Sequence, residues 1–254
     1  MLGRLASWLR GSPAPAPLDP AEVPALDARL AGMEAGERLA WAWERFGARA
    51  AIGTSFQPAG IVLLHLAKRR GLDLPAFTLD TGLLFRETIE LKSVLQDHLG
   101  IVVESVLPDL DLTEQARRHG DRLWERDPDA CCGLRKVAPL GRKLRELDVW
   151  ITGLRRDGSA ARAATPFLEA VAREDGSAVW KLNPLADWTR ERVWAHLKEH
   201  RLPHNPLHDR GYRSIGCSVC TKPAGEGADE RAGRWPGFDK TECGLHTRLR
   251  RPSA

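Results

Sequence analysis

The sequence predicts an α/β protein built on a doubly wound, mostly parallel sheet. Two observations support this. Short apolar or β-branched stretches alternate with longer segments of helical periodicity between residues 34 and 200. Small and polar residues follow several of the predicted strands, where α/β sheets usually keep ligand-binding groups. A chain of 254 residues can bury one sizeable core, so we expect one α/β domain with extensions.

The expected elements follow one another in the order that such a sheet requires. The strands are predicted at 48–52, 74–79, 101–106, 148–153, 168–172 and 179–182. The helices are predicted at 34–46, at 61–68, at 87–99, from after Lys136 to about 147, and from 189 to about 200. The last two strands flank Asp175-Gly176 and should form a hairpin, and Thr189 should cap the last helix.

The chain is expected to fall into three parts. Residues 1–30 form an extension, whose segment 11–25 is rich in proline and alanine and predicts a semi-stiff linker without helix or strand. Residues 31–225 form the α/β domain, and residues 226–254 form a flexible tail. The start has no signal-peptide pattern and the longest apolar runs are too short for a bilayer crossing, which predicts a cytoplasmic protein without membrane contact.

The net charge of +4 comes from dispersed basic residues. This pattern suits a small anionic substrate, such as a phosphate or sulfate ester, better than a nucleic acid. Three stretches are candidates for binding it: the loop 53–60 before a helix, the Asp80-Thr81-Gly82 turn, and the loop that carries Arg155, Arg156 and Arg162. The alternatives are ordinary turns and a solvated charged loop.

The five cysteines divide into a set of four and one more. Cys217 and Cys220 have the spacing of a metal half-site. Cys131 and Cys132 can form a vicinal disulfide, pack in the core or supply two metal ligands, and their local sequence does not decide among these. Four thiolates suit zinc or a [4Fe–4S] cluster, and adjacent cysteines favour the cluster because it offers a separate iron to each thiolate.

The remaining thiol, Cys243, lies near the C-terminus between Lys240 and His246 and is followed by Gly244. A lone thiol with basic neighbours in a flexible segment suits a nucleophile that moves between a bound substrate and an outside partner. The alternative is an incidental tail cysteine.

Several motifs from Gly53 to His246 resemble the assimilatory adenylyl-sulfate (APS) reductases, the iron–sulfur branch of the phosphoadenylyl-sulfate (PAPS) reductase family. They are Cys131-Cys132-Gly133-Leu134-Arg135-Lys136, Thr152-Gly153-Leu154-Arg155-Arg156, Lys181-Leu182-Asn183-Pro184-Leu185, Gly211-Tyr212-Arg213-Ser214-Ile215-Gly216-Cys217-Ser218-Val219-Cys220-Thr221 and Lys240-Thr241-Glu242-Cys243-Gly244-Leu245-His246. The resemblance implies a fold of the PP-loop (adenine nucleotide alpha hydrolase-like) type.

The resemblance also implies the roles of individual residues. Cys243 is the implied nucleophile, and the implied ligands of a [4Fe–4S] cluster are Cys131, Cys132, Cys217 and Cys220. The residues implied to surround the nucleotide are Ser55, Leu79, Asp80, Thr81, Gly82, Lys136, Arg162, Arg231 and Arg234. The sequence departs from the family pattern at Ala59, Gly60, Leu83, Gly158 and 236–238, which puts contacts to the ribose and loops in question.

These assignments predict a thioredoxin-dependent reduction of APS to sulfite and AMP through an S-sulfocysteine on Cys243, in assimilatory sulfate reduction. One alternative is a reductase that prefers PAPS or accepts both nucleotides. Another is a zinc-stapled nucleic-acid-binding protein or tRNA-thiolation relative on the same fold. The expected partners are APS and thioredoxin, without nucleic acid or membrane, and the family leaves a homo-oligomer open.

Overall fold

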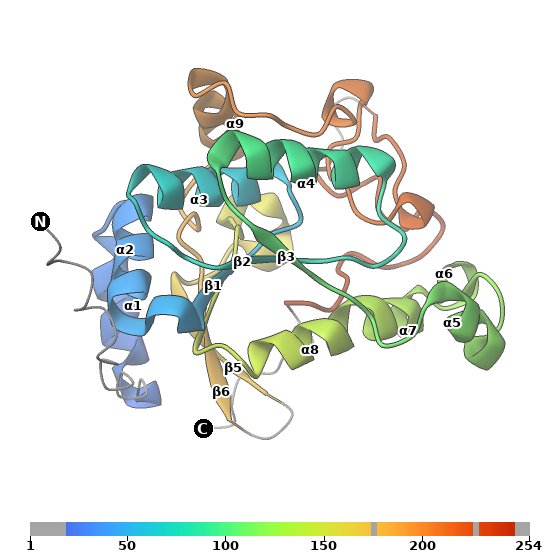
Figure 1. Cartoon of the computed structure of the whole chain (residues 1–254), viewed down its shortest axis with the longest axis horizontal. Helices are drawn as coiled ribbons and strands as arrows, with labels where there is room; N and C mark the ends of the chain where they lie inside the picture. The colour runs from blue at the N-terminus through green and yellow to red at the C-terminus, as the bar shows by residue number, and fades with distance from the viewer. Residues whose placement is uncertain (1–18, 174–176, 226–228, 247–254) are drawn as a thin grey trace, which may run out of the picture.

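In the computed structural model, which describes residues 19–173, 177–225 and 229–246, six strands form one sheet in the order β3-β2-β1-β4-β6-β5 (Figure 1). Their bounds are β1 Ala50–Gly53, β2 Ala76–Leu79, β3 Val103–Val106, β4 Val149–Ile151, β5 Leu168–Ala172 and β6 Ala178–Leu182. All neighbours pair in parallel except β5 and β6, which form the predicted hairpin. The predicted mostly parallel sheet is confirmed.

Helices cover both faces of the sheet, as a doubly wound fold requires (Figure 1). The helices of the described residues are α1 Val23–Ala31, α2 Ala35–Phe46, α3 Pro58–Arg69, α4 Arg86–Leu99, α5 Leu112–His119, α6 Leu123–Arg126, α7 Pro128–Cys132, α8 Ala138–Leu144 and α9 Arg190–Glu199. In the view of Figure 1, α3, α4 and α9 lie above the sheet and α8 lies below it.

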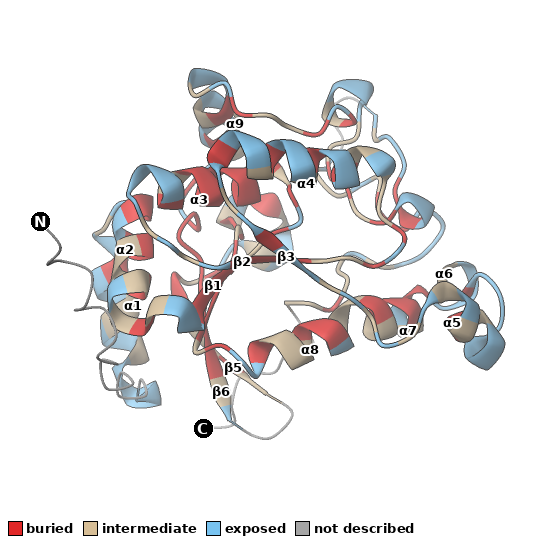
Figure 2. Ribbon diagram, in the orientation of Figure 1, coloured by how far each residue is buried: buried red, intermediate tan, exposed pale blue. Residues whose placement is uncertain are grey.

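The strands alternate their side chains between two hydrophobic clusters. Ile52 and Ile151 face the larger cluster, which includes residues of α1, α2, α3, α4 and α9. Ala51 and Trp150 face the smaller one, built with Leu140 and other residues of α8. Burial follows the same pattern, with buried ribbon concentrated on the strands and on the sheet-facing sides of the helices (Figure 2). The central strands are therefore buried on both faces, as parallel strands usually are.

The linker predicted over residues 11–25 is wrong for residues 20–25, which are helical. Pro20 begins a 3₁₀ turn and Pro24 lies in the first turn of α1, where proline leaves no hydrogen bond unmade. Leu30 of α1 is only 1% exposed in the larger cluster, and Asp27 accepts hydrogen bonds from the backbone N–H groups of Phe167 and Leu168. Residues 23–31 therefore pack on the body of the domain. The first part of the predicted extension, residues 1–18, lies outside the described residues, as does the tail from residue 247.

Most other predicted elements are present, and the first four strands are shorter than expected. Thr189 caps α9 as predicted, its hydroxyl accepting the backbone N–H of Arg192 at 3.2 Å. The Asp175-Gly176 turn lies outside the described residues. The predicted basic helix after Lys136 corresponds to α8, and a π-helical turn, Gly133–Val137, connects α7 to it. Such wide turns are frequent at functional sites.

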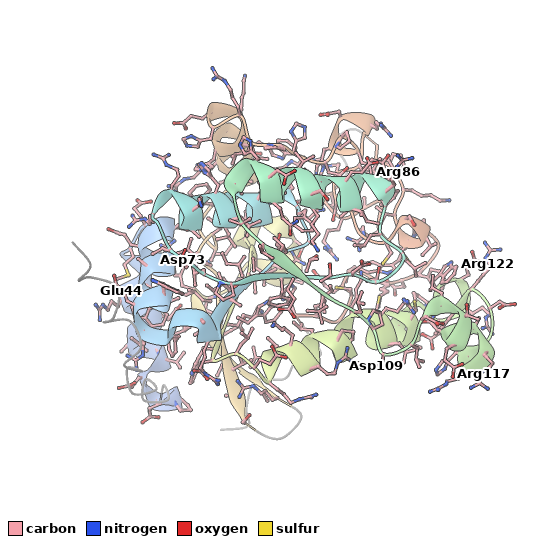
Figure 3. All side chains as sticks on the ribbon, in the orientation of Figure 1. Glu44, Asp73, Arg86, Asp109, Arg117 and Arg122 are labelled. Carbon is pink, nitrogen blue, oxygen red and sulfur yellow. The ribbon has the colours of Figure 1, made fainter. Side chains whose placement is uncertain are left out.

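Charged side chains project from many separate elements. The six labelled in Figure 3, Glu44, Asp73, Arg86, Asp109, Arg117 and Arg122, come from different segments around the periphery. This agrees with the dispersed charge in the sequence. In the described part of the chain no helix is both long and apolar enough to cross a membrane.

Candidate active site

A cavity of about 220 Å³ opens at the carboxyl ends of β1, β2 and β4. It is bordered by Gly53 and Thr54 after β1, Leu79 at the end of β2, and Thr152 and Gly153 after β4. Because β2 and β4 flank β1 on opposite sides, their crossover connections diverge here and leave a crevice. The topology alone thus places a ligand site at this edge.

The loop after β1 is shaped to bring backbone groups to the cavity. The Thr54 hydroxyl accepts the backbone N–H of Phe56 at 3.0 Å, and Phe56 has a positive φ of 54°. The first turn of α3 then contributes Pro58, Ala59 and Gly60 to the wall. A Cβ on Gly60 would come within 2.5 Å of the Thr54 hydroxyl, so the close fit requires glycine. A helix N-terminus with free N–H groups at a cavity favours an anion.

Besides Arg155, four basic side chains line the same cavity: Lys136, Arg162, Arg231 and Arg234. Lys136 comes from the π-helical turn, Arg162 from the loop after β4, and the two other arginines from the segment after the Cys-x-x-Cys turn. Arg234 is buried, and its Nη1 lies 3.3 Å from the Ser214 hydroxyl. Burial and the neighbouring Arg234 lower the pKa of Arg231 to about 10, so it remains charged at neutral pH.

The C-terminal segment up to His246 lies in this cavity. The His246 ring stacks on Trp150 with centroids 5.1 Å apart and planes 11° apart, and Leu245 packs against the smaller hydrophobic cluster. Lys240 Nζ donates to Asp129 Oδ1 of α7 at 2.5 Å. These contacts bring Cys243 to the cavity wall, although the predicted flexibility of the tail stays a prediction.

Glu242 ties the tail to two of the cavity arginines. Its carboxylate lies 2.8 Å from Arg162 Nη2 and 3.2 Å from Arg231 Nη2. All three side chains are less than 20% exposed, with values of 12% for Glu242, 19% for Arg162 and 16% for Arg231. A carboxylate of the chain itself therefore occupies the positions where an anionic ligand would bind these arginines.

The surroundings of Cys243 favour its thiolate. Burial raises the pKa of the Cys243 thiol, but Lys136, the backbone N–H of Leu245, Arg234 and Arg231 outweigh that effect and leave the pKa below its ordinary value. The pKa of Lys136 lies above its ordinary value. Burial lowers this pKa, but the nearby Cys217 and Cys243 raise it by more. The thiol and the amine thus each favour the charged form of the other.

The other four cysteines form a buried cluster, and Cys243 packs against it. Cys131, Cys132, Cys217 and Cys220 are 5–9% exposed and pack with Leu83, Leu123 and Trp235. All five cysteines are free, so the vicinal disulfide that the sequence left open is not formed. The four thiols border one small cavity together with Lys136. Lys136 therefore lies between this cavity and the larger one.

This donor set fits a tetrathiolate metal centre. Burial raises the pKa of Cys131 to about 11 and of Cys220 to about 12, so without a cation these two groups would be neutral thiols in an apolar pocket. A metal centre stabilises their thiolate form and uses all four. The Thr81 hydroxyl lies 3.3 Å from Cys217 Sγ, and the Arg135 guanidinium is held behind Cys131 by Thr81 O and Gln115 Oε1.

Most of the sequence-predicted residues meet at this site. Those that border the larger cavity are Ser55, Leu79, Thr81, Lys136, Arg162, Arg231, Arg234 and Cys243. Asp80 and Gly82 do not border it. Asp80 Oδ1 accepts the backbone N–H of Gly82 at 2.9 Å, and Gly82 has a positive φ of 68°, so this pair shapes the turn that holds Thr81.

Sequence reasoning did not assign roles to Trp150 and His246, which border the larger cavity, to Arg135, which borders the cysteine cavity, or to Glu242, which pairs with Arg162 and Arg231. Three of them stand inside quoted motifs, Glu242 and His246 with Cys243 and Arg135 next to Lys136, and that proximity was the available signal. The stacking of His246 on Trp150 joins residues almost a hundred positions apart and has no local signature.

The phosphoadenosine phosphosulfate reductase domain model matches residues 49–223, more than half of the chain. The chain belongs to this family. A curated relative, the adenosine 5'-phosphosulfate reductase of Salinibacter ruber, is 49% identical over 82% of this chain and 82% of its own. The adenosine 5'-phosphosulfate reductase of Halalkalibacterium halodurans is 45% identical over 82% and 89%. A phosphoadenylyl-sulfate reductase from Candida auris, solved as a phosphate complex, superposes with a TM-score of 0.70 at 29% identity, covering 81% of this chain and 98% of that one.

The structure shows what surrounds the residues at which this chain departs from the pattern of the phosphoadenosine phosphosulfate reductase family. Gly60 is enclosed by Thr54, and Ala59 lies 3.2 Å from where a Cβ on Gly153 would be, so this part of the loop is too close-packed for long side chains. Leu83 packs beside the four cysteines and its carbonyl accepts the N–H of Ser218. Gly158 has room for a Cβ, since Arg162 Nη1 would be its nearest neighbour at 3.6 Å. Nothing in the structure explains glycine there.

Proposed function

We propose that the protein reduces adenosine 5'-phosphosulfate to sulfite and AMP in sulfate assimilation, with Cys243 as the nucleophile. The observation that carries this proposal is the Cys243 thiol on the wall of a cavity that also holds Lys136, Arg231 and Arg234. Its support among relatives is that curated proteins 42–49% identical to this chain are named adenosine 5'-phosphosulfate reductases.

The cavity offers complementary groups to such a substrate. The hydroxyls and N–H groups of the Thr54 loop and the first turn of α3 suit the phosphate, and Arg162 and Arg231 offer planar guanidinium groups for bidentate contacts. The sulfate would then lie toward Lys136 and Cys243, which border the same cavity. For the arginines to bind the nucleotide, Glu242 must give up its present contacts with them.

The first chemical step is the transfer of the sulfonate group to the thiolate. Cys243 Sγ forms a bond to the substrate sulfur, the bond from that sulfur to the phosphate oxygen breaks, and AMP leaves with the electron pair. The product on the protein is an S-sulfocysteine. Lys136, Arg231 and Arg234 are charged before the reaction begins, so they stabilise charge on the sulfonate and the leaving phosphate without reorganisation.

The second step releases sulfite and supplies the electrons. One thiolate of a reduced thioredoxin attacks Cys243 Sγ, sulfite departs with the electron pair of the sulfur–sulfur bond, and the resulting mixed disulfide is resolved by the second thioredoxin thiol. Thioredoxin is oxidised by two electrons and the sulfur passes from sulfate to sulfite level. We also assign the reaction to the cytoplasm, where dithiol reductants are kept reduced.

Cys131, Cys132, Cys217 and Cys220 are the residues that would hold a [4Fe–4S] cluster. When bound, the cluster would supply a rigid, negatively charged centre rather than electrons, because the dithiol provides both electrons. Lys136 borders the cysteine cavity and the larger one, so its ammonium group offsets charge on either side.

A pair of matched cysteine variants tests the proposal. Cys243→Ser should abolish sulfite and AMP formation while keeping the iron content and the brown chromophore. The control, Cys217→Ser, should lose both the sulfite-forming activity and the brown chromophore with its iron. Mass spectrometry of the wild-type protein with APS and without reductant should find one added sulfonate on Cys243. Sulfite production by Cys243→Ser at the wild-type rate would refute the assignment.

A PAPS-reducing activity is the second candidate, because the superposed Candida auris protein is named for PAPS. The curated relatives named for the adenosine 5'-phosphosulfate reaction are more similar to this chain, at 42–49% identity against 29%, and they favour APS. The ratio of kcat/KM for the two nucleotides decides between them. A ratio favouring PAPS would overturn the substrate assignment while leaving the role of Cys243 intact.

A further inference from the structure

Three histidines meet between α3 and α9, outside the cavities described above. His65 lies on α3, His196 on α9, and His200 directly after α9. One ring nitrogen from each lies within 4.8 Å of the others, and His65 Nδ1 is 2.9 Å from His196 Nε2. The ring centroids are 4.4–5.0 Å apart. Of the described residues, this is the one group of at least three metal-ligating side chains at such distances.

The spacing of the three residues favours a shared ligand. His196 and His200 are four positions apart, so they project from the same face of α9 and its end. His65 faces them from the neighbouring helix and is 9% exposed, whereas the other two are half-buried. An ion held by these three nitrogens would be reached from solvent on the side of α9. It would keep one coordination position open, as in three-histidine zinc sites.

His65 and His196 are also in the protonation state that metal binding needs. Burial first, then the neighbouring histidines and Arg69, lower the pKa of His65 to about 4. Burial, His200, Arg69 and Arg192 lower that of His196 to about 4. Both rings are therefore neutral at pH 7, and a neutral imidazole offers a lone pair.

The third histidine, His200, is in contact with a cation. Arg69 Nη1 lies 3.2 Å from His200 Nε2. A guanidinium only donates hydrogen bonds, so this contact requires an unprotonated Nε2 on His200. Arg69 thus stands beside a nitrogen lone pair at the edge of the cluster, and its side chain can swing toward solvent.

We propose that His65, His196 and His200 form a binding site for a divalent transition metal of the zinc type. Imidazole ligands without thiolate or carboxylate suit zinc, nickel or copper and exclude calcium or magnesium. Because α3 also supplies the first-turn residues of the nucleotide cavity, the ion would link α9 to the helix that supports that cavity. The site is independent of the four cysteines and of the proposed sulfite-forming reaction.

The competing interpretation is a packed polar cluster that binds no ion. His196 also lies 5.7 Å from the ring of Trp188, and such aromatic contacts could by themselves account for the arrangement. The two interpretations differ in one measurable way. A packed cluster gains nothing from added metal, whereas a metal site binds one more ion per chain and stabilises the fold by mass action.

The test compares zinc uptake by the iron-loaded wild-type protein and two variants. After incubation with zinc and dialysis, metal analysis should find one zinc per chain more in the wild type than in His196→Gln/His200→Gln. A His119→Gln control, which removes an exposed histidine at the end of α5, should match the wild type. The fine structure of the X-ray absorption spectrum at the zinc edge should show nitrogen ligands around the added zinc and no sulfur ligands.

Arg69→Ala provides a second test, which does not depend on whether the double variant folds. Removing the guanidinium beside His200 should tighten zinc binding several-fold and increase the rise of Tm that zinc produces. Equal zinc uptake by the wild type and the double variant would overturn the proposal. So would a sulfur shell around the added zinc, or an affinity of Arg69→Ala no higher than that of the wild type.

Discussion

Replacing Glu242 with glutamine should strengthen the binding of AMP. In the structure Glu242 holds Arg162 at 2.8 Å and Arg231 at 3.2 Å, so two proposed nucleotide-binding cations share one internal anion. Glutamine keeps the size of the side chain and removes its charge. The nucleotide then no longer competes with a carboxylate, and the cavity becomes more positive by one unit.

The size of the effect follows from the distances. A phosphate bound by the same arginines would lie roughly 7 Å from the Glu242 carboxylate, which gives a repulsion of about 2 kcal/mol at an effective dielectric constant of about 20. Salt and partial exposure reduce this to about 1–2 kcal/mol, equivalent to roughly 5- to 30-fold in Kd. The gain should shrink as the salt concentration rises.

Isothermal titration with AMP at low salt measures the change directly. The matched control is Glu90→Gln, which removes the same charge from an exposed pair with Arg86 on α4 and should leave the Kd of AMP unchanged. A Kd for Glu242→Gln equal to or weaker than that of the wild type would refute the reasoning, because Glu242 would then not compete for the arginines.

Two further predictions concern the cavity wall. Lys136→Met should lower kcat/KM for sulfite formation by about 10²- to 10³-fold, the usual cost of one preorganised group, with Lys136→Arg partly active in the same assay. If Lys136→Met keeps more than half of the wild-type value, the ammonium does not act on Cys243. Gly60→Ala should cost about 1–3 kcal/mol in urea unfolding, because its Cβ would come within 2.5 Å of the Thr54 hydroxyl. The control Gly32→Ala, with 3.6 Å to the nearest atom, should be neutral or stabilising. Equal midpoints for the two glycine variants would contradict the packing argument.

Elements that depend on short-range sequence were predicted well. Strands such as β1 and helices such as α4 have an apolar periodicity that local sequence reports directly. Residues 20–25 were predicted wrongly because proline count was weighed without position. Pro20 and Pro24 stand in first turns, where proline favours a helix instead of breaking it.

The site was predicted in part, to the extent that its residues belong to compact motifs. Lys136 and Cys243 each stand in a distinctive stretch and were found. The pairing of Glu242 with Arg162 spans 80 positions, and that of His65 with His196 spans 131. No local pattern encodes contacts between residues so far apart in the sequence, because these contacts depend on how the crossovers bring β1, β4 and their helices together.

The amino-acid sequence by itself determined the alternating α/β architecture, the division of the cysteines into four and one, and the family resemblance. These depend on residue type and on spacing within a few turns of chain. Only the tertiary structure decided that Glu242 occupies the arginines, that Lys136 borders both cavities, and that three histidines meet between α3 and α9. Burial, charge pairing and pKa are properties of a side chain's neighbours in space, and folding supplies those neighbours from distant parts of the chain.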